Sequence, residues 1–334
     1  MVASLLGPAE GGALVTPLWR PLFRALADAG IDSICLPRRF RCGLELPQCV
    51  TVWLLTGRYK LCQSEGRGRA LGEWGGVVLA AGGGPAACKW TLARECESQP
   101  AVRFEPPSRP RFIIDLSLWH EHTPGEKREL VEQILASLKA VRCVLWDGAL
   151  WLTHAPAEFM EYLNRHAPGL AHRMNITSGM PRLEAPVVLD PEGDCVFSEE
   201  VARSHAEFIV GGIVDKERPL KSATRRLAEM MGVNKRCRIE LRGRIIGVPD
   251  RINKIVEIVL KTLTGMPLEA AILSAQAKRD RVYRLMWEIV RRARRGRGSA
   301  LVISRAALEE TNWLGAPREE VELALRKARV TVID

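Results

Sequence analysis

From about residue 111 to residue 265, short apolar runs alternate along the chain with segments in which apolar side chains recur at helical spacing. The apolar runs lie at 112–118, 149–153, 185–190 and 208–214 and have the length of buried strands. Thr123, followed by Pro124 and Glu126, predicts a helix start, and the apolar stripe behind it reaches Val141. The alternation predicts an α/β domain whose mostly parallel sheet is covered by helices.

The same pattern continues in the second half of this region. Pro219 suits the first turn of a helix that ends near Gly232, and the alternating sequence at 237–241 predicts another strand. Asp250 is predicted to be the N-cap of a final helix, whose apolar stripe runs from Ile252 to Leu263.

Prolines divide the chain into parts. Pro106, Pro107 and Pro110 interrupt regular structure and predict a boundary near residue 105, and Met266-Pro267 predicts a second one. We therefore expect an N-terminal accessory domain over 1–105 that contacts RNA, with a helix near Leu18 to Ala29. The α/β domain then spans 106–265, and 266–334 forms a basic helical domain.

Composition narrows the class of protein. The chain has 334 residues, of which 47% are hydrophobic and 26% charged, and this balance is typical of a globular protein of two or three domains. No apolar stretch is long enough for a membrane span, and the N-terminus lacks a secretory pattern, so a cytoplasmic location is expected.

The formal net charge of +10 favours a polyanionic partner, although a generally basic surface explains it about equally well. A more specific feature is the predicted helix around 277–298. Its apolar positions, such as Leu285 and Ile289, occupy one face, and five arginines occupy the other: Arg281, Arg284, Arg291, Arg292 and Arg295. This arrangement predicts an exposed basic surface.

The sequence argues against several kinds of site. Nine cysteines contain no CxxC pair, which disfavours a zinc ribbon, and buried free thiols are expected, with a local disulfide in the first hundred residues as the alternative. The six histidines show no metal-ligand spacing, so no metal is predicted. Neither a GxGxxG fingerprint nor a P-loop occurs, which disfavours a nucleotide-binding Rossmann dehydrogenase.

Glycine loops cluster near the ends of the last predicted strands, at Gly211-Gly212, Gly243 and Gly247. In an open α/β sheet, ligands bind at such strand ends, where glycine permits close backbone approach. Asp215 follows the buried strand directly, which favours a functional carboxylate; the alternative is a turn cap paired with Lys216, Arg218 or Lys221.

The string FIVGGIVDKERPLKSAT, with the later INKIVEIVLK, resembles the SPOUT-superfamily methyltransferases that modify N1 of the purine at tRNA position 9, in particular the archaeal type. The resemblance covers roughly residues 111–265. Further matching pieces occur in the same order: IIDLS with Asp115, LVEQ with Gln133, Arg142, LWLTHAP, and VVLD with Asp190.

The resemblance implies a deep C-terminal trefoil knot that holds S-adenosylmethionine (SAM), bound largely through backbone groups. The implied cofactor-binding residues are Val210, Gly211, Gly212, Glu240, Leu241, Gly243, Gly247, Val248, Ile252 and Asn253. This chain departs from the family at Ile239-Glu240-Leu241, where relatives carry a Leu-Pro-hydrophobic stretch, and its loop over 243–251 is longer than in the eukaryotic members.

The resemblance also implies three residues near the target base. Asp215 would accept the N1 proton of guanine, or stabilise the positive charge that develops on adenine. Gln133 and Asp190 would contact the edge of the base; a helix-surface Gln and a turn Asp are equally good interpretations. The sequence leaves adenine and guanine both open.

A stacked base in tRNA must be extruded before it reacts, so contacts to the tRNA backbone are expected over a wide surface. The candidate residues are Lys127, Arg128, Arg142, Arg218, Lys221, Arg225, Arg284, Arg291 and Arg295. A monomer is expected. The alternatives are a SPOUT methyltransferase acting on another tRNA or rRNA site, and an RNA-binding homologue without SAM; the presence of Gly211, Gly212, Asp215 and Asn253 argues against the latter.

Overall fold

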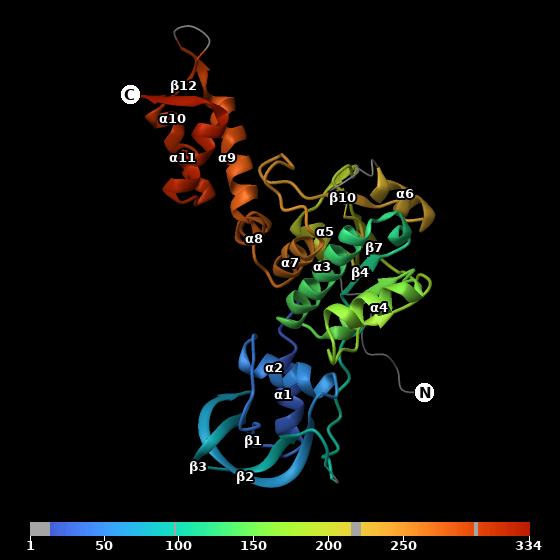
Figure 1. Ribbon diagram of the computed structural model, residues 1–334. Coiled ribbons are helices and arrows are strands. Elements are labelled where there is room, and N and C mark those ends of the chain that lie inside the picture. Colours follow the sequence, from blue (N-terminus) through green and yellow to red (C-terminus); the bar gives the residue numbers. More distant parts are fainter. Residues whose placement is uncertain (1–13, 97, 215–221, 297–299) are drawn as a thin grey trace.

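The computed structural model describes residues 14–96, 98–214, 222–296 and 300–334. In Figure 1 the chain passes from an N-terminal part with a long hairpin, through a central parallel sheet with helices, to a C-terminal part of helices and short strands. Among the described residues, no helix is both long and apolar enough to cross a membrane.

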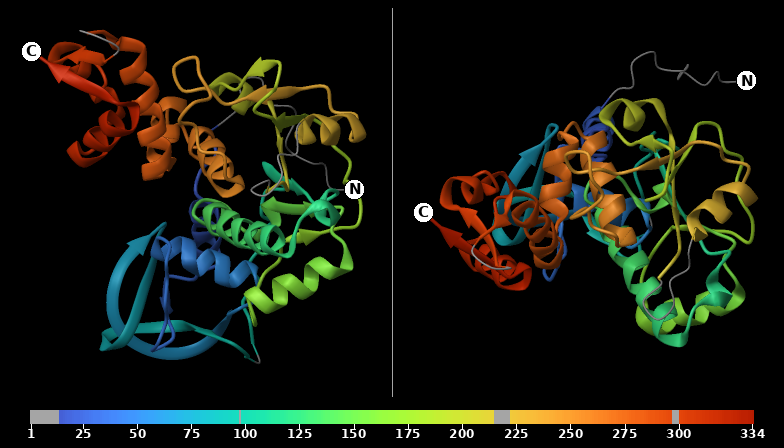
Figure 2. Two further views of the ribbon diagram at one scale, coloured as in Figure 1. Left: turned by 45° about the horizontal axis from the view of Figure 1, so that its top comes forward. Right: turned by 90° about the horizontal axis from the view of Figure 1, so that it is seen from above.

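The N-terminal part is built around two long antiparallel strands. Its elements are α1 (Trp19–Asp28), β1 (Ser33–Cys35), α2 (Leu46–Leu55), β2 (Lys60–Trp74) and β3 (Val77–Ala93), and β3 lies between β1 and β2 in the sheet. The hairpin curves around the two helices, as Figure 2 shows, and encloses a core that includes Phe23, Ile34 and Trp53. A Cβ atom on Gly84 would lie 2.5 Å from the backbone N of Arg69, so this irregularity in the pairing of β2 and β3 requires glycine.

The central sheet has seven strands in the order β6-β5-β4-β9-β7-β10-β8, and every neighbouring pair is parallel. The strands are β4 (Arg111–Asp115), β5 (Leu150–Thr153), β6 (Asn175–Ile176), β7 (Pro186–Leu189), β8 (Cys195–Val196), β9 (Glu207–Gly211) and β10 (Arg236–Arg238). The predicted α/β class with a parallel sheet is thereby confirmed, although β10 is shorter than predicted.

Helices cover both faces of this sheet. They are α3 (Pro124–Arg142), α4 (Ala157–His166), α5 (Glu199–Ser204), α6 (Ala223–Met230) and α7 (Ile252–Leu263). Because side chains alternate along a strand, Phe112 and Phe208 point into the larger core with α3 and α7, whereas Ile113 and Ile209 pack with Ala228 of α6. The predicted start of α3 is confirmed, since Thr123 and Glu126 form a capping box.

The C-terminal part contains α8 (Leu268–Ala275), α9 (Lys278–Arg292), α10 (Arg305–Glu309) and α11 (Arg318–Ala328). It also contains a small sheet of β11 (Arg294–Arg295), β12 (Leu301–Ser304) and β13 (Val330–Ile333), which a purely helical domain does not account for. Short 3-10 helices occur at η1 (Trp119–Glu121), η2 (Asp147–Ala149) and η3 (Asn312–Leu314).

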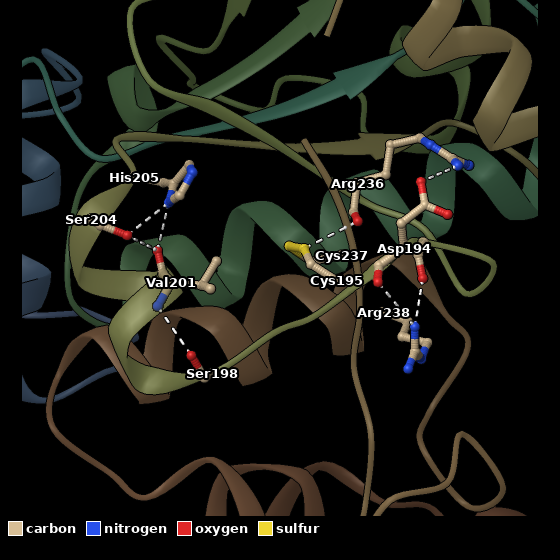
Figure 3. The surroundings of a disulfide bond; sticks show 10 residues. Asp194, Cys195, Ser198, Val201, Ser204, His205, Arg236, Cys237 and Arg238 are labelled. Carbon is tan, nitrogen blue, oxygen red and sulfur yellow. Dashed lines mark hydrogen bonds and ion pairs between the residues drawn. A yellow bond between two sulfur atoms is a disulfide. The ribbon is translucent and has the colours of Figure 1, made fainter. Parts of the chain in front are cut away.

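The expectation of free thiols is wrong for eight of the nine cysteines. The pairs are Cys35–Cys88, Cys42–Cys49, Cys62–Cys96 and Cys195–Cys237, and Cys143 is free. Figure 3 shows the fourth pair, which joins β8 to its neighbour β10 in the central sheet. Spacing alone gave no indication of this pair, because its partners meet only through the parallel strand pairing.

Candidate functional site

A cavity of about 540 Å³ opens at the carboxyl ends of β7 and β10. Its lining residues come from the two strand ends, the loop before α7, α7 itself and α9: Leu189, Asp190, Pro191, Cys237, Ile239, Ile245, Ile246, Gly247, Val248, Pro249, Asp250, Ile255, Arg279, Asp280 and Tyr283. The cavity has the size of a small-molecule site, and the edge of an open parallel sheet is where such sites occur.

Asp190 lines this cavity and is held in place by an ion pair and a backbone hydrogen bond. It is 3% exposed, its Oδ2 lies 2.9 Å from Nη1 of Arg236, and its Oδ1 accepts a hydrogen bond from the N–H of Glu192 at 2.9 Å. The hydrogen bond to Asp194 raises the pKa of Arg236, and burial acts in the opposite direction. The hydrogen bond to Asp190 raises this pKa further. The arrangement corresponds to the turn-Asp interpretation.

The cavity loop, residues 239–251, is held in place by side chains from the C-terminal part. Arg284 of α9 donates hydrogen bonds to the carbonyl oxygens of Leu241, at 2.7 Å, and Ile246, at 3.0 Å. The Nε2 of Gln276 donates to the carbonyl oxygen of Gly247 at 2.7 Å. Three carbonyl groups of one loop therefore depend on α9 and the segment before it.

This geometry corrects the prediction for Arg284. Only 1% of the residue is exposed, and its guanidinium also binds Glu288 at 2.9 Å. Burial lowers the pKa of Arg284, while Glu288 opposes that effect. Arg284 does not lie on the outer basic surface, because the cavity loop covers the helix face that periodicity alone assigned to solvent.

At the start of α7, the hydrogen-bond acceptor is a different residue from the one predicted. Gln133 of α3 is 7% exposed, and its Oε1 accepts a hydrogen bond from the N–H of Ile252 at 2.9 Å. Asp250, which was predicted to be the cap, is instead paired with Arg279 on α9 at 2.9 Å. The N-cap prediction for Asp250 is therefore wrong, and a buried side chain from another helix supplies the missing acceptor.

Gly211 and Gly212 end β9 but do not line the cavity. The N–H of Gly212 donates to the carbonyl oxygen of Asp115 at 2.8 Å, and a Cβ atom there would lie 2.6 Å from that oxygen. Close contact with β4 therefore requires glycine at this position. A large side chain at Gly212 would disturb the packing of β9 against β4, so such a substitution would not test ligand binding alone.

Most of the other residues predicted to bind the cofactor lie outside the lining of the cavity. Val210, Leu241 and Ile252 are buried, Asn253 is half-buried, Glu240 pairs with Arg238 at 2.6 Å, and Gly243 is exposed in the cavity loop. Gly247 and Val248 line the cavity itself. Apolar residues at the strand ends, such as Leu189 and Ile239, were missed; their signal was their position near the carboxyl ends of predicted strands.

A polar cluster lies at the carboxyl ends of β4 and β5. Asp115 is 1% exposed and accepts hydrogen bonds from Thr153 Oγ1 at 2.8 Å, from Ser117, and from Nδ1 of His154. Nearby, Nε2 of His122 accepts the N–H of Val214 at 3.0 Å, and so fixes the chain just before Asp215. Asp215 itself lies outside the described residues, as do Arg218 and Lys221.

The described candidates for RNA contact differ in how accessible they are. Arg142 binds the buried Asp147 through two hydrogen bonds, at 2.7 and 2.6 Å, so its role is structural. Lys127 is paired with Glu158 at 3.0 Å. Four candidates are exposed: Arg128, Arg225, Arg291 and Arg295, the last of which lies in β11 beyond the end of α9.

No family model matches the chain. It is 33% identical over 304 residues to the tRNA (adenine(9)-N1)-methyltransferase of Sulfolobus acidocaldarius, covering 89% of this chain and 94% of that protein. It is 31% identical over 245 residues to the tRNA (guanine(9)-/adenine(9)-N1)-methyltransferase of Thermococcus kodakarensis, covering 70% and 66%.

Among solved structures, Sulfolobus acidocaldarius Trm10 in complex with S-adenosylhomocysteine is similar, with a TM-score of 0.71 and 28% identity. The match covers 93% of this chain and 99% of that chain, and so includes the N- and C-terminal parts as well as the central sheet.

Proposed function

The chain belongs to the family of tRNA N1-methyltransferases that act on the purine at position 9, and we propose that it transfers a methyl group from SAM to N1 of that purine. The observation that carries the proposal is the 33% identity, over most of both chains, to an enzyme of this activity. The cavity at the ends of β7 and β10 supports it, because it offers a site of suitable size.

The lining of the cavity fits the chemistry of SAM. Aliphatic side chains such as Leu189, Ile239 and Ile255 suit the faces of an adenine ring. When bound, SAM supplies an electrophilic methyl group. We assign its binding to Gly247 and Val248 together with the backbone around Glu240 and Leu241.

In this proposal the chain contributes mainly by positioning. Methyl transfer requires the ring nitrogen to approach the methyl group in line, so a fixed site lowers the barrier by removing the cost of ordering the reactants. Arg284 and Gln276 hold the cavity loop, and Gln133 holds the start of α7. These three side chains act on the site through the backbone that they bind.

Asp215 is assigned to the target base. It follows Val214, whose N–H is bound by His122 next to the ends of β4 and β9. As a base, its carboxylate would take the N1 proton of guanine; toward adenine, it would stabilise the positive charge that develops on the ring.

The finer features of the family complete the proposal. The cavity loop is assigned to a trefoil knot with the segment after Gly212, which includes residues outside those described. The exposed Arg128, Arg225, Arg291 and Arg295, with the N-terminal part, are assigned to the tRNA surface. A monomer in the cytoplasm, where its substrate is found, remains the expectation.

Titration of the full chain with SAM in a calorimeter tests the cofactor assignment. The expected result is binding of one SAM per chain, and Ile255→Trp, which fills the cavity, should abolish it. An absence of binding to the wild-type chain would instead favour an RNA-binding protein without SAM.

A further inference from the structure

Another hollow, of about 400 Å³, is lined by residues 242–244 of the cavity loop. It is formed where the turn at Arg242 and Arg244 faces α9 and η3. Its outer side chains are Arg242, Arg244, Trp287, Arg291 and Trp313, which we call the Arg–Trp hollow. The adjoining residues Ile245 to Val248 of the same loop line the cofactor cavity, so one loop contributes to both sites.

Cations lie over the faces of both tryptophans. The guanidinium carbon of Arg242 is 3.7 Å from the ring centroid of Trp313, and those of Arg244 and Arg291 are 5.7 and 5.1 Å from that of Trp287. Both indole rings are half-buried, so part of each remains at the surface. Stacked guanidinium and indole groups are fixed in orientation and can accept a further planar group.

The hollow is positive at its surface, although one of its outer arginines, Arg242, is paired with Glu269 at 2.8 Å. Its one lining carboxylate, Glu288, is 2% exposed and is bound by Arg284 and Arg292 beneath. Within the described part of the chain, Arg244 has no carboxylate at ion-pair distance, and Arg291, which is 57% exposed, has a single contact of 3.4 Å to Glu288. These two guanidinium groups are available to an anion.

We propose that the Arg–Trp hollow binds one unstacked nucleotide of the tRNA substrate, with its phosphate on Arg244 and Arg291 and its base against Trp287. Aromatic faces combined with arginines select a nucleotide whose base is free of its stack, since a paired and stacked base exposes no face. The inference rests on the proposed function for the identity of the RNA. It adds a contact made by the same loop that lines the cofactor cavity.

The test compares tRNA binding by the full chain and by two double variants that lose the same charge. Arg244→Ala with Arg291→Ala removes the proposed phosphate contacts, whereas Arg305→Ala with Arg318→Ala removes two exposed arginines elsewhere. The first pair should weaken binding and reduce the slope of log affinity against log salt by up to about one, as for one phosphate, and more than the second pair does. Equal effects of the two pairs would overturn the proposal.

Stacking is tested separately. Trp287→Leu should weaken binding of a five-nucleotide single-stranded RNA roughly 5- to 150-fold, which is the range of one stacked base. Affinity for S-adenosylhomocysteine should stay at the wild-type value, which shows that the cavity loop remains in place. Unchanged RNA affinity, or equally tight binding of AMP alone, would overturn the assignment to RNA.

These outcomes are separable from a failure of the proposed function. If the wild-type chain does not methylate position 9 but the Arg244 and Arg291 variant still loses RNA affinity, RNA binding by the hollow is supported and the proposed reaction is contradicted. If the chain methylates tRNA and the variants bind tRNA as tightly as the wild type does, only the proposal of RNA binding by the hollow is contradicted.

Discussion

Gly247 lies so close to Arg284 that a Cβ atom added to Gly247 would be 2.5 Å from the Cβ atom of Arg284. The contact brings the cavity loop onto α9, where Arg284 binds the carbonyl groups of Leu241 and Ile246. The shape of the proposed cofactor site is therefore set by the C-terminal part as well as by the central sheet.

The first prediction is that Gly247→Ala weakens binding of S-adenosylhomocysteine roughly 5- to 150-fold, as overpacking of this tight contact displaces the loop. Gly243→Ala is the matched control. Both glycines have positive φ, +84° and +73°, but a Cβ atom on Gly243 meets nothing within 4 Å. Calorimetry on both variants checks the prediction, and equal losses would show that backbone strain rather than the contact with α9 is responsible.

The second prediction concerns the disulfide between Cys195 and Cys237, which closes a sequence separation of 42 residues next to the cavity. Replacing both cysteines with serine should destabilise the protein by about 2–4 kcal/mol, because the unfolded chain gains freedom. Thermal unfolding under oxidising conditions measures the effect. Cys143→Ser, at the exposed free cysteine, should leave the midpoint unchanged. A double variant as stable as the wild type would contradict the prediction.

The third prediction is a pH dependence at the contact between α9 and α11. Arg281 binds both carboxylate oxygens of Glu320, at 2.8 and 2.9 Å, and these bonds lower the pKa of Glu320 against the opposing effect of burial. A carboxyl group whose pKa is lowered by folding stabilises the protein above its unfolded pKa, about 4.3, and loses that contribution as the pH falls through the folded value.

Glu320→Gln should therefore cost about 1–2 kcal/mol at pH 7, and the difference from the wild type should shrink below about pH 4. Glu322→Gln, on the same helix, removes a pair with the 89% exposed Arg318 and should have little effect at either pH. Thermal melts at pH 7 and pH 3.5 make the comparison. A Glu320→Gln difference that did not depend on pH would rule out the ion pair as its cause.

The fourth prediction separates the two roles of Asp215. If it is a general base, Asp215→Asn should slow transfer to guanine by roughly 10²- to 10⁴-fold, because the N1 proton loses its acceptor. Transfer to adenine should slow less, since adenine N1 carries no proton and the amide oxygen still accepts a hydrogen bond from the 6-amino group. Single-turnover assays with transcripts that differ at position 9 measure both, and equal slowing would contradict the base role.

The parts of the fold that follow from local pattern were predicted well. The strand predicted at 112–118 is found as β4, which ends earlier, at Asp115, and the predicted capping box at Thr123 and Glu126 is present; both are encoded by neighbouring residues. The N-terminal hairpin was not predicted, because its many glycines hide the alternation of a strand. The reason for such a glycine becomes visible only in the paired strands, as at Gly84, which lies where the pairing of β2 and β3 is irregular.

The site was predicted less well, for a related reason. Asp190 lines the cavity and Gln133 binds the start of α7, but their partners, Arg236 and the N–H of Ile252, lie 46 and 119 positions away. Arg284 shows the same limit, because helical periodicity cannot reveal that a loop from residues 241–247 covers a polar face. Contacts between distant segments decide which candidate faces solvent and which supports the site.

The most direct test of the central claim is methylation of unmodified tRNA transcripts that carry A, G or U at position 9, followed by nucleoside analysis and mapping of the modified position. The purified full chain with SAM should form N1-methyladenosine or N1-methylguanosine at position 9 of a purine transcript, and no product on the U9 transcript. Methylation at another position, equal methylation of the U9 transcript, or no methylation of any transcript would contradict the proposed function.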